Sequence, residues 1–331
     1  TNIVDVLIQI SYVYYKVGNY SMALDFAKQS LSNSDQFGDS TGVSESYNTL
    51  GLIYWKLGDF DKALEHQLRS LSYDEEENHN TFNNIGIIYG VLGNYEKALE
   101  YQLRALEIRR NLNLIGGIAG SLNNIGIIYK QMGSLDTALA YFLEALDMRE
   151  GMGQSWRLAG AYNNVGSIYR AKGDQTMALE YFRQSLSYSN EADNTFEYAS
   201  TLLNIGDVFL ELDARDSARF YLQDGIILAN EIRAQNLLVD GYYSLYQLYF
   251  DEEDYPAALE YYKAYSVVKD SVFSQQSEDR ISELRIIYET EEKEQEIELL
   301  KQRDTLQAQK NRRDRNLRNL LIVILILVVV L

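Results

Sequence analysis

Apolar residues recur at helical spacing over most of the chain, and the pattern itself repeats. In one unit, Ile85, Ile88 and Leu92 follow one another at intervals of three and four residues, which places them on one face of an α-helix. A small residue marks the middle of each such helix, and successive copies lie 35 or 40 residues apart by subtraction of their numbers. These positions are Ser11, Gly51, Gly86, Gly126, Gly166 and Gly206, with Tyr246 in a seventh unit.

Three further positions recur with the small residue. An aromatic residue follows it after three positions and an alanine after twelve, as Tyr89 and Ala98 follow Gly86. Between them stands a turn signal such as Gly93-Asn94 or Gly133-Ser134, in which Gly ends one helix in a left-handed conformation and the short polar side chain caps the next. Small residues on both helices allow close approach, and the aromatic side chain fills the space beside the contact. Each unit is therefore predicted to be an antiparallel helix pair.

These small, aromatic, Gly and Ala positions, found over about residues 4–270, resemble the tetratricopeptide repeat. The usual period is about 34 residues, and the longer spacing here is similar to the extended variant found in kinesin light chain and related peptide-binding arrays. The resemblance implies an all-α fold, a right-handed superhelical solenoid of about seven helix pairs over residues 1–273. Asp213 and Glu253 replace the turn Gly in the last two units.

The composition excludes some classes of site and disfavours some classes of partner. The chain has 331 residues, of which 46% are hydrophobic, with 27 Tyr, one Pro and no Cys. Without Cys there can be no disulfides, thiolate metal sites or Cys nucleophiles. The formal net charge of -18 disfavours nucleic acid, whose binding requires a basic surface, and it is compatible with a cationic partner.

A second regularity, Asn just before the small residue, is not needed to form the helix pair. Asn is a mediocre helix former, so its repetition in mid-helix requires compensation. In the repeats that this chain resembles, this part of the first helix lines a concave groove, where amide side chains hydrogen-bond the backbone of an extended peptide. The resemblance therefore implies that a protein or peptide segment binds in a groove lined by Asn48, Asn83, Asn84, Asn123, Asn124, Asn163, Asn164 and Asn204.

The alternative is that each Asn bonds the neighbouring repeat and only aligns the stack. With two Asn in most units, one could be structural and the other could face the ligand. Lys130 and Arg170 occupy equivalent offsets in adjacent repeats, on the same helix face as Trp55 and Asp207. The two cations are candidates to hold a carboxylate of the ligand, or they are solvated surface charges.

Residue types that carry catalysis are scarce. His66 is expected on the solvent side of a second helix and His79 in a polar link between repeats, so neither a catalytic triad nor a His metal site is predicted. The acidic run at 74–77 lacks the ligand spacing of a calcium loop, and the glycines at 116–120 and 151–153 lack the Lys-Ser/Thr of a P-loop. We therefore expect no enzyme activity, no metal and no cofactor in this chain.

The pattern changes at about residue 274. Residues 274–318 are predicted to form a capping helix and then a charged helix without Gly or Pro, which is either a homodimeric coiled coil through 281–318 or an exposed stalk. Leu320–Leu331 contains only Leu, Ile and Val, but twelve residues are fewer than the roughly 20 that a bilayer span requires. We expect 319–331 to begin a transmembrane helix that continues beyond Leu331; a buried C-terminal helix is the alternative.

This layout resembles bacterial sensor proteins of the Bacteroidetes type, in which repeats, a charged helix and one transmembrane helix precede a histidine kinase or a helix-turn-helix regulator. It implies that the repeats are the periplasmic sensory region of a single-pass membrane signalling protein. The basic residues of 301–318 favour the opposite orientation by the positive-inside rule. The alternatives are a membrane-anchored scaffold without an output domain and, third, an enzyme whose catalytic part lies beyond Leu331.

Overall fold

The computed structural model describes residues 3–73, 78–153 and 155–271, all of which belong to one compact unit. These residues form helices joined by short turns and include no strand, which confirms the all-α class. The helices are α1 (Ile3–Lys16), α2 (Tyr20–Phe37), α3 (Ser40–Lys56), α4 (Phe60–Tyr73), α5 (His79–Val91), α6 (Tyr95–Asn111), α7 (Ile115–Gln131), α8 (Leu135–Gly151), α9 (Ser155–Ala171), α10 (Gln175–Glu191), α11 (Thr195–Glu211), α12 (Arg215–Glu231) and α13 (Gln235–Asp251). Residues 255–271 form one more helix.

Several predictions concern residues outside this description. They are the acidic run at 74–77, the capping and charged helices at 274–318, and the apolar run at 319–331. Among the helices that the structure describes, none combines the length and the apolar character needed to cross a bilayer.

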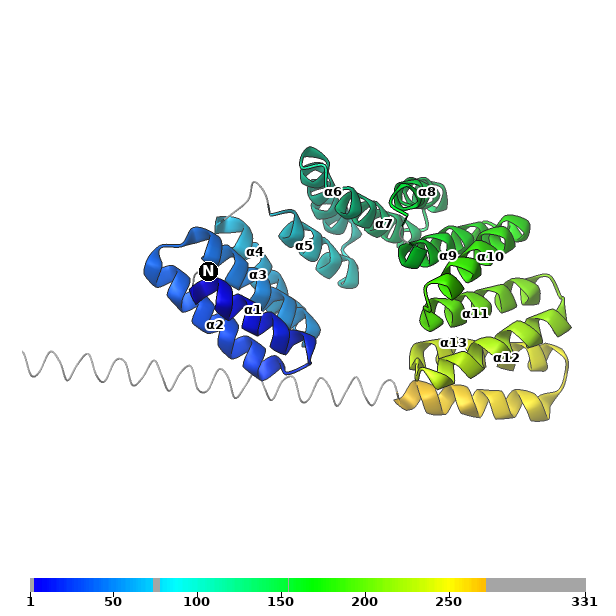
Figure 1. Cartoon of the computed structure of the whole chain (residues 1–331). Helices are drawn as coiled ribbons and strands as arrows, with labels where there is room; N and C mark the ends of the chain where they lie inside the picture. Colours follow the sequence, from blue (N-terminus) through cyan, green and yellow to red (C-terminus); the bar gives the residue numbers. More distant parts are fainter. Residues whose placement is uncertain (1–2, 74–77, 154, 272–331) are drawn as a thin grey trace, which may run out of the picture. The chain divides into compact units, whose positions relative to one another are not determined.

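The helices pack in consecutive pairs (Figure 1). Each odd-numbered helix from α1 to α11 packs against the even-numbered helix that follows it, and each pair packs against the next. Residues 255–271 supply the second helix of the seventh pair, because Tyr261 and Val268 pack against a buried cluster that includes Leu245 of α13. Seven stacked helix pairs make up the solenoid that the sequence predicts.

The turn between the two helices of a pair has the predicted geometry. Gly93 and Gly173 adopt left-handed conformations with φ of 75° and 79°. The residues that follow them, Asn94 and Asp174, accept hydrogen bonds at 3.2 and 3.1 Å from the backbone N–H three positions later. Ser134 makes no such bond at the start of α8, so the predicted cap is wrong at that turn.

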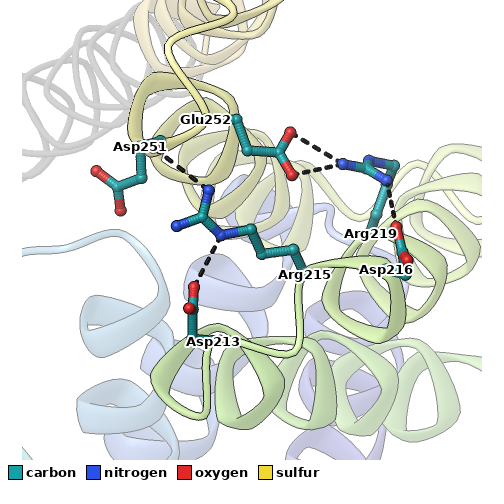
Figure 2. Close-up of polar contacts among 6 residues, drawn as sticks. All are labelled: Asp213, Arg215, Asp216, Arg219, Asp251 and Glu252. Carbon is teal, nitrogen blue, oxygen red and sulfur yellow. Dashed lines mark hydrogen bonds and ion pairs between the residues drawn. The ribbon is translucent and has the colours of Figure 1, made fainter.

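In the turns within the sixth and seventh helix pairs, a residue other than glycine adopts the left-handed conformation. Asp213 and Glu253 have φ of 54° and 60°, a conformation that costs strain for a residue with a Cβ atom. Ion pairs join residues around α12 to one another and to the end of α13 (Figure 2). Nη2 of Arg219 on α12 donates to both carboxylate oxygens of Glu252, which follows α13, at 2.7 and 2.9 Å, and Arg215 pairs with Asp213 at 2.8 Å. The first of these ion pairs ties the sixth repeat to the seventh.

In repeats two to six, the glycine in the middle of the first helix accommodates a large side chain of the second helix. A Cβ atom at Gly126 would lie 2.7 Å from Phe142, and one at Gly51 would lie 2.6 Å from Gln67. Ala138 is fully buried, as expected for the close approach of the two helices. The partner of the glycine, sixteen positions further on, was not identified from the sequence; it is Gln67, Gln102, Phe142, Phe182 or Leu222 in successive repeats.

The recurring aromatic residue stacks on a second ring, fifteen positions after the small residue. Equivalent pairs occur in all seven repeats, with ring centroids 5.1 to 5.6 Å apart. In the second repeat the second ring is His66, whose centroid lies 5.9 Å from that of Tyr47 and 5.1 Å from that of Tyr54. The expectation that His66 faces solvent is therefore wrong, and burial lowers its pKa to about 4.

Candidate ligand-binding face

The odd-numbered helices from α3 to α13 share one face, which carries three hollows. The first lies between α3 and α5, the second between α5 and α7, and the third among α9, α11 and α13; their volumes are about 60, 240 and 440 Å³. We call this surface the odd-helix face and define it by these residues of the hollows: Leu52, Trp55, Asn84, Ile87, Val91, Asn124, Ile127, Arg170, Asn204, Asp207, Glu211 and Asp240.

All eight predicted asparagines join one row of side-chain hydrogen bonds between repeats, which we call the asparagine ladder. The Asn two positions before the small residue donates its Nδ2–H to Oδ1 of the Asn three positions before the small residue in the preceding repeat. The four bonds measure 2.9 to 3.1 Å and join Asn84 to Asn48, Asn124 to Asn83, Asn164 to Asn123, and Asn204 to Asn163.

The ladder explains why the first and last of these repeats carry one Asn and the others two. The second repeat needs only the acceptor Asn48, which is followed by Thr49, and the sixth needs only the donor Asn204, which is preceded by Leu203. The aligning role considered from the sequence is thus present at every one of these positions. Each carboxamide has two N–H donors and an oxygen with two lone pairs, so a ladder bond uses only part of its capacity.

The two predicted cations lie on adjacent odd helices but have partners within the chain. Lys130 donates from Nζ to Oγ of Ser167 at 3.0 Å. Arg170 spans from α9 to α11, where it pairs with Asp207 and Glu211, both at 2.8 Å. Arg170 therefore does hold carboxylates, as its position suggested, but they are supplied by the next repeat of the same chain.

The hollow among α9, α11 and α13 is acidic. Asp207, Glu211 and Asp240 line it together with the single cation Arg170. Ser244 donates to Asp207 at 2.6 Å. Burial raises the pKa of Asp207, although the Arg170 guanidinium and the Ser244 hydroxyl both lower it. Within the described ranges, no group of three His, Cys, Asp or Glu side chains is placed to hold a metal ion.

The other two hollows are lined by apolar side chains and a buried glutamine each. Gln67 and Gln102 are fully buried, and their Nε2 groups donate to the backbone oxygens of Asn48 and Asn83 at 3.1 and 2.9 Å. In the part of the chain that the structure describes, Oε1 of both glutamines has no hydrogen-bond partner, and neither does Nε1 of Trp55. A buried acceptor without a donor costs about 1–3 kcal/mol, so two at equivalent positions need an explanation.

A buried guanidinium supports the ladder beside the second hollow. Arg109, only 7% exposed, donates to Oγ of Ser121 at 2.7 Å, to the backbone oxygen of Gly117 at 3.2 Å and to Oδ1 of Asn83 at 3.3 Å. Its Nε donates to Nδ1 of His79 at 3.3 Å. These acceptors are all neutral, and burial lowers the pKa of Arg109. His79 is the first residue of α5 rather than part of a link, which corrects the expectation for it.

Sequence reasoning identified the face but missed several of its residues. Gln67, Gln102 and Arg109 lie on second helices, and no spacing rule connects a second helix to the hollow beside the first. Asp240 and Glu211 lie on first helices, at offsets where most of the other repeats carry uncharged or basic residues. One sequence feature could have pointed to the glutamines. Both lie sixteen positions after the small residue, where the next three repeats carry Phe or Leu.

Comparison with known proteins agrees with this architecture. The family model described as Tetratricopeptide repeat matches residues 2–76, 77–151 and 157–230, in three consecutive blocks that make up more than half of the chain. No curated protein matches the chain in sequence.

Solved structures with similar folds are repeat proteins of low sequence identity. The apo form of RapI has a TM-score of 0.68 and 17% identity, and the match covers 82% of this chain and 99% of RapI. BtubC from P. vanneervenii has a TM-score of 0.56 and 22% identity, with 63% and 91% covered. A Rap protein complexed with Competence and Sporulation Factor has a TM-score of 0.51 and 16% identity, with 84% and 99% covered. At these identities the likeness concerns the fold.

Proposed function

Because the chain belongs to the tetratricopeptide repeat family, whose members are protein-interaction scaffolds, we propose that the odd-helix face binds an extended segment of a partner protein. One observation carries this proposal: each hollow is lined by one donor of the asparagine ladder, namely Asn84, Asn124 and Asn204 in turn. A segment that follows the ladder therefore meets all three hollows. The family also supports the expectation that this chain is an interaction module and not an enzyme.

The chemistry of the ladder suits an extended backbone. A peptide segment presents alternating N–H and C=O groups, and the ladder donors that line the hollows each have one further N–H and an oxygen that the ladder does not use. The ladder bonds hold the amides in register, so little rotamer freedom is lost on binding. The Rap protein solved with Competence and Sporulation Factor supports the idea that a fold of this kind accommodates a separate ligand.

The test uses short random peptides displayed on phage, selected on the purified full chain. Fluorescence anisotropy then measures the affinity of selected peptides for variants. We expect Asn124→Ala combined with Asn164→Ala to weaken binding at least tenfold. The matched variant Asn123→Asp keeps an oxygen that accepts from Asn164 while replacing the NH₂ group, and we expect it to weaken binding as well.

The two variants separate the ligand role of the ladder from its aligning role. If the double alanine variant folds and binds as tightly as the original chain, the asparagines do not contact the ligand. If that variant binds weakly but Asn123→Asp binds normally, the ladder acts only by aligning the repeats.

We further propose that the repeats are the periplasmic sensory region of a single-pass membrane signalling protein, with the charged helix at 274–318 relaying the bound state. The apolar run at 320–331 and the basic residues of 301–318 support attachment to a membrane. Because the chain has no Cys, Glu96→Cys on the exposed surface of α6 gives a unique thiol. An impermeant maleimide should label it once the outer membrane is opened; labelling only after cell lysis would place the repeats inside.

A further inference from the structure

We propose that the two hollows on α3, α5 and α7 are anchor pockets for uncharged apolar side chains of the bound segment, with space for the Leu or Phe class in the larger hollow. Backbone N–H groups of that segment donate to Oε1 of Gln67 and Gln102 after the side chains that border each hollow shift, because both atoms are buried in the unbound chain. This inference rests on the proposed function and names the class of partner that the site takes.

The lining of the pockets selects against charge. The larger pocket is lined by Ile87, Val91, Ile127 and Ile128 together with three uncharged amide side chains, and neither pocket is lined by a charged residue. A charged group placed there would lose its water without gaining a partner. Val91 and Ile127 are 56% and 37% exposed, so apolar area is available for burial. A volume of about 240 Å³ exceeds the roughly 150 Å³ of an apolar cavity that accepts benzene.

The glutamines provide the polar contact. Each Nε2 donates to a backbone oxygen, and exchanging the amide N and O would place oxygen against oxygen, so the orientation of each amide is determined. Oε1 then remains buried and without a donor among the described residues. At the same position, the later repeats have Phe142, Phe182 and Leu222, which fill the space beside their glycines. The chain thus carries an amide in place of an apolar side chain at the two repeats where the anchor pockets open.

An extended peptide segment satisfies these groups better than an apolar surface alone. Trp55 and Gln67 both line the smaller pocket; Nε1 of Trp55 lacks an acceptor among the described residues, and Oε1 of Gln67 lacks a donor. Successive peptide units offer a carbonyl oxygen to the first and an N–H to the second. The adjacent ladder residues Asn84 and Asn124 also face these pockets, so backbone recognition continues from one pocket to the next.

The experiment uses the same phage-displayed peptides on the full chain, with variants that copy the later repeats. Gln102→Phe and Gln67→Phe place Phe opposite a glycine, as Phe142 lies opposite Gly126, so both are expected to fold. We expect selected peptides to be enriched in Leu or Phe, and their affinity to fall at least tenfold in either variant while the unfolding midpoint stays the same or rises. Gln102→Met, which removes the acceptor but keeps the side-chain length, should cost about threefold to tenfold.

The matched control is Leu103→Ala on α6, which removes an apolar side chain that is 44% exposed away from the pockets and should leave affinity unchanged. If peptides bind Gln102→Phe and Gln67→Phe normally but lose affinity on Arg170→Ala, the face binds segments and the anchor pockets are wrong. If no peptide is selected at all, the proposed function fails together with this inference.

Two other occupants would overturn the assignment to a partner segment. Sedimentation that shows self-association of the original chain, abolished by Gln102→Phe, would identify a second copy as the occupant. Peptide binding that appears only when residues 320–331 are removed would identify the apolar segment of this chain itself.

Discussion

The two halves of the odd-helix face are built on the same repeat and differ in their chemistry. From α3 to α7 the face is apolar, with Leu52, Ile87 and Ile127 one position after the small residue. From α9 to α13 the same offset carries polar residues, including Ser167 and Asp207. The ladder runs from α3 to α11 and so enters both halves.

This difference separates positions that build the fold from positions that choose a ligand. The turn residues, the buried alanines and the stacked ring pairs recur in nearly every repeat because each repeat must bury the same surface against its neighbours. The residues one and four positions after the small residue vary and line the hollows in several repeats, and the residue sixteen positions after it lines a hollow where it is Gln67 or Gln102. The half with the buried glutamines has open apolar pockets, and the half with Phe and Leu has a charged hollow.

The largest effect is expected where a buried guanidinium bonds only neutral acceptors among the residues that the structure describes. Arg109→Ala leaves Ser121 and the Gly117 carbonyl without this donor and removes one of the two donors to Asn83. Because each buried group without a partner costs about 1–3 kcal/mol, we expect a loss of about 2–5 kcal/mol in the free energy of unfolding, measured by urea denaturation. The control Arg104→Ala, an exposed residue of the same helix, should cost less than about 0.5 kcal/mol. A loss below about 1 kcal/mol for Arg109→Ala would show that this cluster does not support the apolar half.

The next effect concerns the stacked ring pair that contains a histidine. His66 has its pKa lowered to about 4 by burial, against 6.5 in the unfolded chain, so the unfolded state takes up the proton first as the pH falls. Its stability contribution is present above pH 6.5 and is lost between pH 6.5 and about 4, by roughly 1–3 kcal/mol. His66→Tyr, the residue type found at this position in five other repeats, should remove this pH dependence in urea titrations at pH 7 and pH 4.5. An unchanged pH profile would show that His66 is not held neutral by the stack.

A smaller effect, equal in both halves, is expected for the ladder. Asn84→Ala in the apolar half and Asn204→Ala in the charged half each remove one donor and leave Asn48 or Asn163 with an unfilled acceptor. We expect each variant to lose about 1 kcal/mol of unfolding free energy. If the losses of unfolding free energy in the two variants differ by more than about 1 kcal/mol, the ladder does not stabilise the two halves equally.

The smallest effect is expected for Asp207→Asn in the charged half. Burial raises the pKa of Asp207 above its value in the unfolded chain, so its stability contribution is present at low pH and is lost as the pH rises through the folded-state pKa. At pH 7 the neutral variant should therefore be as stable as the original chain or slightly more stable, when thermal melting of the two is compared. A clear destabilisation at pH 7 would show that the ion pair with Arg170 outweighs the cost of burying the carboxylate.

Much of the fold could be predicted because its determinants are local. Gly93-Asn94 and similar turns, the small residue and its aromatic follower, and the period between units are all visible along the sequence. The failures are also instructive. Ser134 has the residue type of a cap but does not act as one, and His66 was assigned to the surface because its pairing with Tyr54 depends on a ring of the other helix.

The candidate site was predicted in part. The asparagines, Lys130 and Arg170 were found by their common offsets, and all of them lie on first helices. What could not be predicted was which partners they find, since Arg170 bonds Asp207 and Glu211 of the next repeat. Gln67 and Gln102 were missed because their significance depends on a hollow, which is a property of the packed structure.

The sequence by itself determined the helix pairs, their turns and the recurrence of the asparagines, because helix formation and capping depend on residues within a few positions of one another. The tertiary structure alone decided that Asn84 bonds Asn48 and that Asn124 bonds Asn83, partners 36 and 41 residues apart. It also decided which hollows remain open. Contacts between repeats depend on how side chains of different helices fill a shared volume, and no local pattern specifies that packing.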